Sequence, residues 1–132
     1  MPDDTLELVR EAVRSWEHGD EQLMRRVFHP DAVFIDHSRP DALEFRGHEG
    51  FVRAYRSWTG TWREARLHSD EASLIAPGLA VVPGRMAGIA KASQIPVERP
   101  VAGLYWVAGG RILRLEIFGS EEAAREAADS LA

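Results

Sequence analysis

The sequence contains no cysteine, and this absence excludes several kinds of chemistry. Disulfide bonds, thiolate nucleophiles and cysteine-ligated zinc sites all need the missing side chain. The absence also fits a reducing compartment, where disulfides are rare. Long apolar runs are lacking too, since no window approaches the roughly 20 apolar residues of a membrane-spanning helix. The start, "MPDDTLELVREA", is acidic and has no signal-peptide pattern. We therefore predict a cytoplasmic protein without a membrane partner.

Positive charge is in deficit. Lysine and arginine number 16 against 21 acidic residues, which gives a formal net charge of −5. Nucleic-acid binding needs a basic surface, so we predict no nucleic-acid partner. The five histidines form no HxH or HExxH motif, which predicts no metal site. No glycine-rich loop follows a strand and opens a helix, and we predict no cofactor.

The chain has 132 residues, of which 45% are apolar, and this is enough for one domain with its own core. We expect a single domain over residues 1–132, because no repeat or low-complexity linker interrupts the sequence. Apolar residues at helical spacing predict helices in the following segments: 4–19, 21–28, 48–58 and 120–131. Strand patterns predict a strand over 32–38 and several strands after Arg66, including a hairpin over 101–119.

The expected helix ends follow from capping residues. Gly19 is a natural C-terminal stop for the first helix, and Asp20 can cap the second. Proline disfavours helical geometry in the residue before it, so "HPD" should end the second helix, and the segment "RPDALEFRG" should be a loop. Ser120 is the expected N-cap of the last helix. Helices followed by a long run of strands indicate an α+β fold.

One acidic residue stands out at the end of an apolar strand. In "AVFIDHSRP", four apolar residues lead to Asp36. This carboxylate could serve as a catalytic base. It could equally cap a turn or pair with Arg39 or Arg46 at the surface. His37 has the opposite strand parity, so we do not expect it to form a dyad with Asp36.

Several stretches of the sequence resemble one family. "EHGDEQLMRRVFHPDAVFID", "FRGHEGFVRAYRSW" and "GGRILRLEIFGSEEAAREA" are similar to the SnoaL-like family of the nuclear transport factor 2-like superfamily, in order and over nearly the whole chain. The superfamily that the chain resembles includes polyketide cyclases and ketosteroid isomerases. It implies a cone-shaped α+β barrel, with a strongly curved antiparallel sheet wrapped around N-terminal helices and an internal cavity.

The resemblance to ketosteroid isomerases places their catalytic base at Asp36. Their tyrosine and aspartic acid, which stabilise an enolate, correspond to Ala12 and to a position at or near Gly103. Neither side chain present here donates a hydrogen bond. Glu116 is a second candidate acid by similarity to polyketide cyclases. The residues expected to line the cavity are Trp16, Phe34, Phe51, Tyr55, Trp58, Tyr105, Arg114 and Phe118.

The last strand has two faces, and parity alone cannot say which one is inward. Arg114, Glu116 and Phe118 share one face, while Leu113, Leu115 and Ile117 share the other. The resemblance favours Phe118 in the cavity, with Glu116 and Arg114 beside it. The aliphatic face, with Leu104 and Trp106, would then be outward and would form a homodimer through the sheet.

We therefore expect a SnoaL-like domain with an apolar cavity. Its function would be cofactor-free acid/base catalysis of the isomerase, cyclase or dehydratase type on a small apolar or polyketide-like molecule. Two alternatives stay open: a non-catalytic protein that binds a small molecule, and a dimeric interaction module.

Overall fold

The structure is a computed structural model that describes residues 4–38 and 43–130. Within these residues the chain is an α+β fold, as the sequence predicts. The elements, in chain order, are α1 (Thr5–His18), α2 (Glu21–Val27), β1 (Phe28–Asp36), β2 (Leu43–Arg46), α3 (Gly47–Thr61), β3 (Trp62–Ser69), β4 (Ser73–Ala76), β5 (Leu79–Ala90), β6 (Pro96–Ala108), β7 (Arg111–Phe118) and α4 (Glu121–Asp129).

The capping residues act as the sequence predicts. Gly19 ends α1 in the left-handed conformation, with φ of 64°. The Asp20 side chain accepts a hydrogen bond from the backbone N–H of Leu23 at 3.1 Å, at the start of α2. Ser120 accepts one from Ala123 N–H, also at 3.1 Å, at the start of α4. These local bonds set the directions in which α1, α2 and α4 leave their preceding segments.

Three boundaries differ from the expected ones. The segment "HPD" lies inside β1, which starts at Phe28 directly after α2. Part of the expected loop is strand β2, whose Phe45 pairs with Phe34 of β1. Helix α3 runs beyond its expected end at residue 58 as far as Thr61, and β3 begins directly after it at Trp62.

The strands form one curved sheet in the order β2-β1-β7-β6-β5-β3, with β4 paired to β5. Neighbouring strands are antiparallel except β1 and β7, which run parallel. The sheet is therefore mixed, which corrects the expectation of a purely antiparallel one. Its two edges, β2 and β3, do not pair with each other in residues 4–38 and 43–130, so the barrel is open there.

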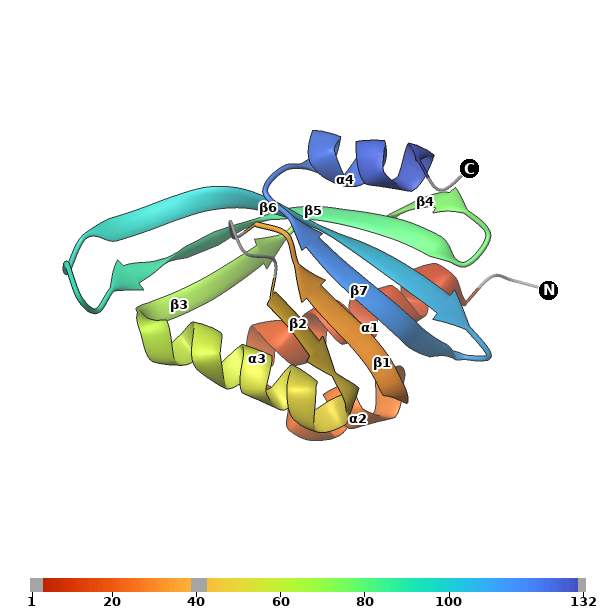
Figure 1. Ribbon diagram of the computed structural model, residues 1–132, viewed down its shortest axis with the longest axis horizontal. Helices are drawn as coiled ribbons and strands as arrows, with labels where there is room; N and C mark the ends of the chain where they lie inside the picture. Colours follow the sequence, from red (N-terminus) through yellow and green to blue (C-terminus); the bar gives the residue numbers. More distant parts are fainter. Residues whose placement is uncertain (1–3, 39–42, 131–132) are drawn as a thin grey trace.

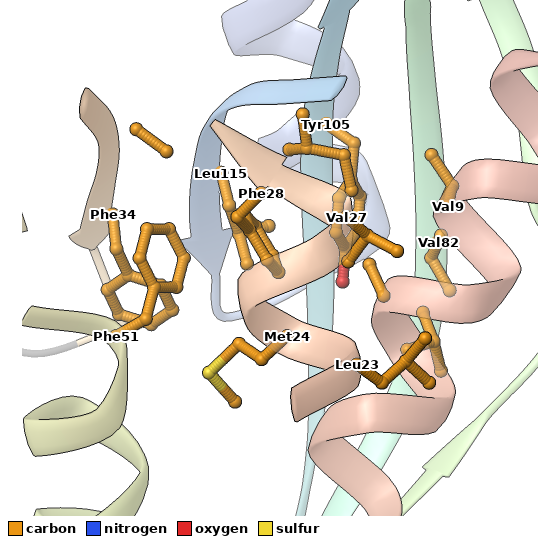
Figure 2. Close-up of a cluster of buried hydrophobic side chains, with 14 of the residues drawn as sticks. Val9, Leu23, Met24, Val27, Phe28, Phe34, Phe51, Val82, Tyr105 and Leu115 are labelled. Atoms are coloured by element: carbon orange, nitrogen blue, oxygen red, sulfur yellow. The ribbon is translucent and has the colours of Figure 1, made fainter. Parts of the chain in front are cut away.

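The helices cover both faces of this sheet. In Figure 1, α1, α2 and α3 lie against one face and α4 lies against the other. The larger core cluster fills the space between the sheet and α1 to α3 (Figure 2), and includes the fully buried Phe28, Phe51 and Ile112. A smaller cluster, with Val81, Leu104 and Ala124, lies under α4. We call the face that α1 to α3 cover the concave face of the sheet, and the face that α4 covers the convex face.

Within the described residues, none of the helices combines the length and apolar character that crossing a bilayer requires.

Candidate functional site

A cavity of about 330 Å³ lies on the concave face, between the sheet and helices α1 and α3. Most of the side chains that border it are apolar. From the helices and the edge strands come Ala12, Trp16, Ala54, Ser57, Trp58, Thr61, Leu43, Phe45, Trp62 and Leu67. From the remaining strands and the turn after β1 come Phe28, Phe34, Asp36, Ser38, Met86, Arg99, Val101, Tyr105, Leu115 and Ile117. The cavity is thus placed where a small ligand would meet mainly carbon.

Aromatic rings form a continuous part of the wall. Trp16 stacks on Phe34 with ring centroids 5.7 Å apart and an interplanar angle of 5°. Trp58 lies 5.9 Å from Trp16, and Phe45 meets the edge of Phe34 at 5.8 Å. These contacts join α1, α3, β1 and β2, so the wall is held by four different elements. A wall of packed rings keeps its shape when no ligand is bound.

Asp36 is the one acidic side chain among the described residues of the wall. It is half-buried at the end of β1, next to Ile117 of β7 and Leu43 of β2. Its Oδ1 accepts two hydrogen bonds from Ser38, at 2.9 Å from the backbone N–H and at 2.5 Å from the hydroxyl. Both of these bonds end on Oδ1. The carboxylate therefore faces the cavity and also caps its own turn.

The proposed surface partners of Asp36 do not hold it in the described residues. Arg46 pairs with Glu44 instead, and the distance from Arg46 Nε to Glu44 Oε2 is 3.0 Å. Arg39 lies outside the described residues. Of the three roles drawn from the sequence, the turn cap is therefore present, and the side chain that forms it also borders the cavity.

Arg99 is the single cation on the described part of the wall. It comes from the exposed end of β6, and its guanidinium carbon lies 5.9 Å from the centroid of the Trp62 ring. Met86 pairs with Arg99 across β5 and β6, and Leu67 pairs with Met86 across β3 and β5. These residues form the rim of the cavity, where the charged group of Arg99 reaches solvent.

Five of the predicted site residues meet at the cavity: Trp16, Phe34, Asp36, Trp58 and Tyr105. Two others lie behind the wall. Phe51 is fully buried and packs against Phe28 and Phe34, with ring centroids 4.2 and 5.5 Å away. Tyr55 meets the ring of Trp16 edge-on at 5.3 Å. Both support the aromatic wall from its far side and do not border the cavity.

The predicted cavity position of Arg114, Glu116 and Phe118 is wrong. Glu116 pairs with Leu104, and Arg114 pairs with Trp106, which places all four on the convex face. Leu115 and Ile117 line the cavity instead. The physical reason is desolvation: aliphatic side chains gain free energy in the cavity wall, whereas two charged groups would lose their hydration there.

On the convex face, Glu116 is the centre of a charged cluster. Its Oε1 lies 2.5 Å from His37 Nε2, and its Oε2 accepts a hydrogen bond from Arg114 Nε at 2.7 Å. The ring of His37 stacks on Phe118 at 4.8 Å. Burial works to raise the pKa of the Glu116 carboxyl, but the hydrogen bonds from Arg114 and His37 outweigh it and hold that pKa below its usual range.

The same face assignment removes the basis on which we expected a dimer. Leu115 and Ile117 are inward, and Leu104 is covered by α4. The large apolar side chains that are exposed in the described residues are Leu74, Ile95 and Leu113, on three different strands or turns. They do not form the aliphatic face that the dimer requires, and the homodimer stays a prediction.

Residues that the sequence interpretation missed include Arg99, Met86 and Ser38. The alternation of side chains along β6 would have identified Arg99, because it shares one face of the strand with Val101, Gly103 and Tyr105. Met86 follows from Arg99, since the two are paired. The sequence carries no comparable signal for Ser38, because only the turn after β1 brings its hydroxyl back to Asp36.

Comparison with known proteins agrees with this architecture. The family model described as "SnoaL-like domain" matches residues 9–115. A search of curated proteins gave no significant match. Among solved structures, an NTF2-like protein from Burkholderia thailandensis superimposes with a TM-score of 0.80 at 20% identity, over 97% of this chain and 98% of the other.

Two further structures share the fold at similar distance. One is a protein with a ketosteroid isomerase-like fold from Catenulispora acidiphila, in complex with trimethylamine, with a TM-score of 0.75, 17% identity and coverage of 87% and 86%. The other, from Jannaschia sp. CCS1, is named as a SnoaL-like polyketide cyclase, with a TM-score of 0.74, 18% identity and coverage of 97% and 94%. The family model covers most of the chain, and the protein belongs to the SnoaL-like domain family.

Proposed function

We propose that the protein is a cofactor-free acid/base enzyme that binds a small, mostly apolar molecule in the concave cavity and uses Asp36 as the proton acceptor. The observation that carries this proposal is the single carboxylate that the described residues place on a mostly apolar, aromatic wall. A base in such surroundings acts on a weakly acidic C–H bond, because water does not compete for it there.

The contacts of Asp36 are suited to this role. Ser38 donates two hydrogen bonds to Oδ1, which fixes the orientation of the carboxylate. In the described residues no hydrogen bond ends on Oδ2, so this oxygen is free to approach a ligand. A proton taken from a carbon next to a carbonyl would move to Oδ2, and its electron pair would pass to the carbonyl oxygen as an enolate. Return of the proton to either end of the enolate restores the base.

Isotope exchange tests this proposal without knowledge of the natural substrate. 2-Tetralone is a two-ring ketone with exchangeable hydrogens beside its carbonyl. In D₂O the protein should accelerate deuterium incorporation into this ketone, as measured by proton NMR. Replacing Asp36 by Asn removes the basic oxygen while keeping the size of the side chain. We expect the D36N rate to fall by about a hundredfold or more.

A matched control is available on the same strand. Asp31 of β1 is exposed and does not border the cavity. The D31N variant should exchange the ketone at the wild-type rate. Equal rates for wild type and D36N, at equal occupancy of the cavity, would remove Asp36 from the mechanism.

A second function, binding without catalysis, is favoured by one specific observation. The two hydrogen bonds from Ser38 are those of an ordinary turn cap, and an aspartate can be retained for that purpose alone. The protein would then hold an apolar molecule between Trp16, Phe34 and Trp58. Native mass spectrometry after gentle purification would detect such a ligand, and a co-purified molecule that D36N still holds would favour this alternative.

A further inference from the structure

Tyr105 places a polar group inside the apolar core. The residue is 7% exposed and lies in the middle of β6, where it belongs to the core cluster between the sheet and the helices. Figure 2 shows its side chain with Phe28, Phe34 and Leu115, which also border the cavity. A tyrosine in this position carries one hydroxyl into a cluster of mostly apolar side chains.

The Tyr105 hydroxyl has no hydrogen-bond partner in residues 4–38 and 43–130. Buried hydroxyl groups are usually paired, because an unpaired one loses its hydration without compensation. The described part of the chain has no side-chain oxygen that is both sealed from water and unpaired. The Tyr105 hydroxyl therefore borders space that a water molecule or a ligand atom can occupy.

This hydroxyl keeps its proton at neutral pH. Burial, reinforced by the negative charge of Glu17, raises the pKa of the Tyr105 phenol well above its usual range. A neutral phenol donates one hydrogen bond, whereas a phenolate cannot. Tyr105 therefore carries a hydroxyl that can donate at neutral pH, on a residue that borders the cavity.

Gly103 makes the position of the Tyr105 ring possible. A Cβ atom at residue 103 would lie 2.9 Å from Cε1 of Tyr105 and 3.2 Å from Cδ1 of Leu115. Any larger residue would push the ring aside. Gly103 is at or near a position where ketosteroid isomerases have an acidic donor. In this chain the absence of a side chain at Gly103 leaves space for the ring of Tyr105, which is a different donor two residues further along β6.

Tyr105 and Asp36 face the same cavity from separate strands. Tyr105 pairs with Leu115 of β7, and Asp36 pairs with Ile117 of the same strand. The two Cα atoms are therefore offset by one two-residue step, about 7 Å, and by two strand spacings, about 10 Å. Their side chains can reach a shared two-ring ligand from two sides.

We infer that Tyr105 is the hydrogen-bond donor for a ligand oxygen, and that the ligand of this cavity is an apolar molecule carrying a carbonyl group. This inference deepens the proposed function, because the same hydrogen bond would stabilise the enolate formed when Asp36 takes a proton. The inference on binding does not require that any proton moves.

The test compares 2-tetralone with tetralin, the hydrocarbon that lacks the oxygen. Calorimetry or equilibrium dialysis gives the ratio of their affinities for each variant. In Y105F, the ketone should lose roughly five- to tenfold in affinity while tetralin binds as before. In the wild type, the infrared band of the ¹³C-labelled carbonyl should lie at lower frequency than in Y105F. The control is Y55F, because Tyr55 lies behind the wall, and it should match the wild type in both measurements.

The outcomes separate this inference from the proposed function. An affinity ratio and a carbonyl band that do not differ between wild type and Y105F would overturn the role of Tyr105, even if D36N abolishes exchange. A shifted ratio and band with no deuterium exchange in the wild type would support Tyr105 as the donor and contradict Asp36 as a base. If neither compound binds the wild type, a two-ring carbonyl ligand is excluded.

Discussion

Asp36 and Glu116 are acidic residues on neighbouring strands, yet they face opposite sides of the sheet. Glu116 is aligned with Ile35 of β1, and Asp36 is aligned with Ile117 of β7. Each carboxylate has different partners that compensate for its loss of hydration. Glu116 is 14% exposed and meets Arg114 and His37, whereas within the part of the chain that the structure describes Asp36 accepts hydrogen bonds from Ser38 alone. A carboxylate that is already hydrogen-bonded to Arg114 and His37 is a poor base, and this distinguishes the two candidates.

The cluster around Glu116 predicts a stability that depends on pH. The folded-state pKa of Glu116 is lowered, so its stabilisation is complete above the unfolded value of about 4.5 and is lost as the pH falls through the lower, folded value. We expect E116Q to reduce the free energy of unfolding by about 1 kcal/mol at pH 7. Urea denaturation at pH 7 and pH 3 measures the difference, which should shrink at the lower pH.

An exposed ion pair provides the comparison for this variant. Glu44 pairs with Arg46, and both side chains are largely accessible to solvent. E44Q should change the free energy of unfolding by only a few tenths of a kcal/mol at either pH. A difference between E116Q and wild type that is as large at pH 3 as at pH 7 would show that the lost charge is not the cause.

The sequence predicted the cavity position of Asp36 but not the orientation of Glu116. The first depends on residues close in sequence, whereas the second depends on contacts between distant segments. Asp36 follows a local apolar run and matches the base of ketosteroid isomerases in the family resemblance, and both signals lie in one segment. The orientation of Glu116 depends on Arg114 of β7, Trp106 of β6 and His37 in the turn after β1. Only the sheet register brings them together.

At the scale of elements, strand β7 shows why parity misleads. The register shifts between Trp106 and Val107, so Val107 pairs with Ile112 and Trp106 pairs with Arg114. Leu113 is the extra residue of a β-bulge and is 39% exposed. Ile112 and Leu115 are consequently both buried, although they are three residues apart. A strict alternation puts Leu113 with the inward aliphatic residues, and the sequence has no signal for the bulge.

Helix α4 was easier to predict, since its cap and its apolar stripe are both local. Ala124 is fully buried and packs on the convex face with Val81 and Leu104. The space there admits no larger side chain without movement of the helix. We expect A124L to lower the free energy of unfolding by about 1–3 kcal/mol through overpacking, as measured by urea denaturation.

The position of α4 also limits what this variant can do. The cavity lies on the other face of the sheet, and no residue of α4 is among the described residues that border it. A124L should therefore bind 2-tetralone with wild-type affinity wherever it is folded. The half-buried Ala123 is outside the cluster under α4, so A123L should be tolerated better. Equal stability of A123L and A124L would contradict this account of the packing.

At the scale of the whole molecule, one sheet separates two kinds of interior. On the convex side, α4 covers a buried cluster of small and aliphatic side chains, with Trp106 and Phe118 packed against it, and this packing serves stability. The concave side combines a packed core around Phe28 and Phe51 with an open volume of about 330 Å³. Filling this volume with side chains would have stabilised the protein further. Under the proposed function, this unfilled space, with a carboxylate and a phenol on its wall, serves binding rather than folding.

This division predicts opposite behaviour for two identical substitutions. Ala12 is 2% exposed and borders the cavity, whereas Ala124 is buried under α4. A ligand present at a hundredfold its Kd stabilises the wild type by about 2.7 kcal/mol, or roughly 8 °C in Tm. With 2-tetralone, A12L should lose most of this shift, because the leucine side chain occupies the ligand's volume, while its own unliganded stability falls less than that of A124L. The A124L variant should start from a lower Tm and keep the full ligand shift. Thermal denaturation with and without the ketone measures both quantities. A ligand shift in Tm that survives in A12L but disappears in A124L would place the binding site on the convex face, and would contradict the proposed cavity.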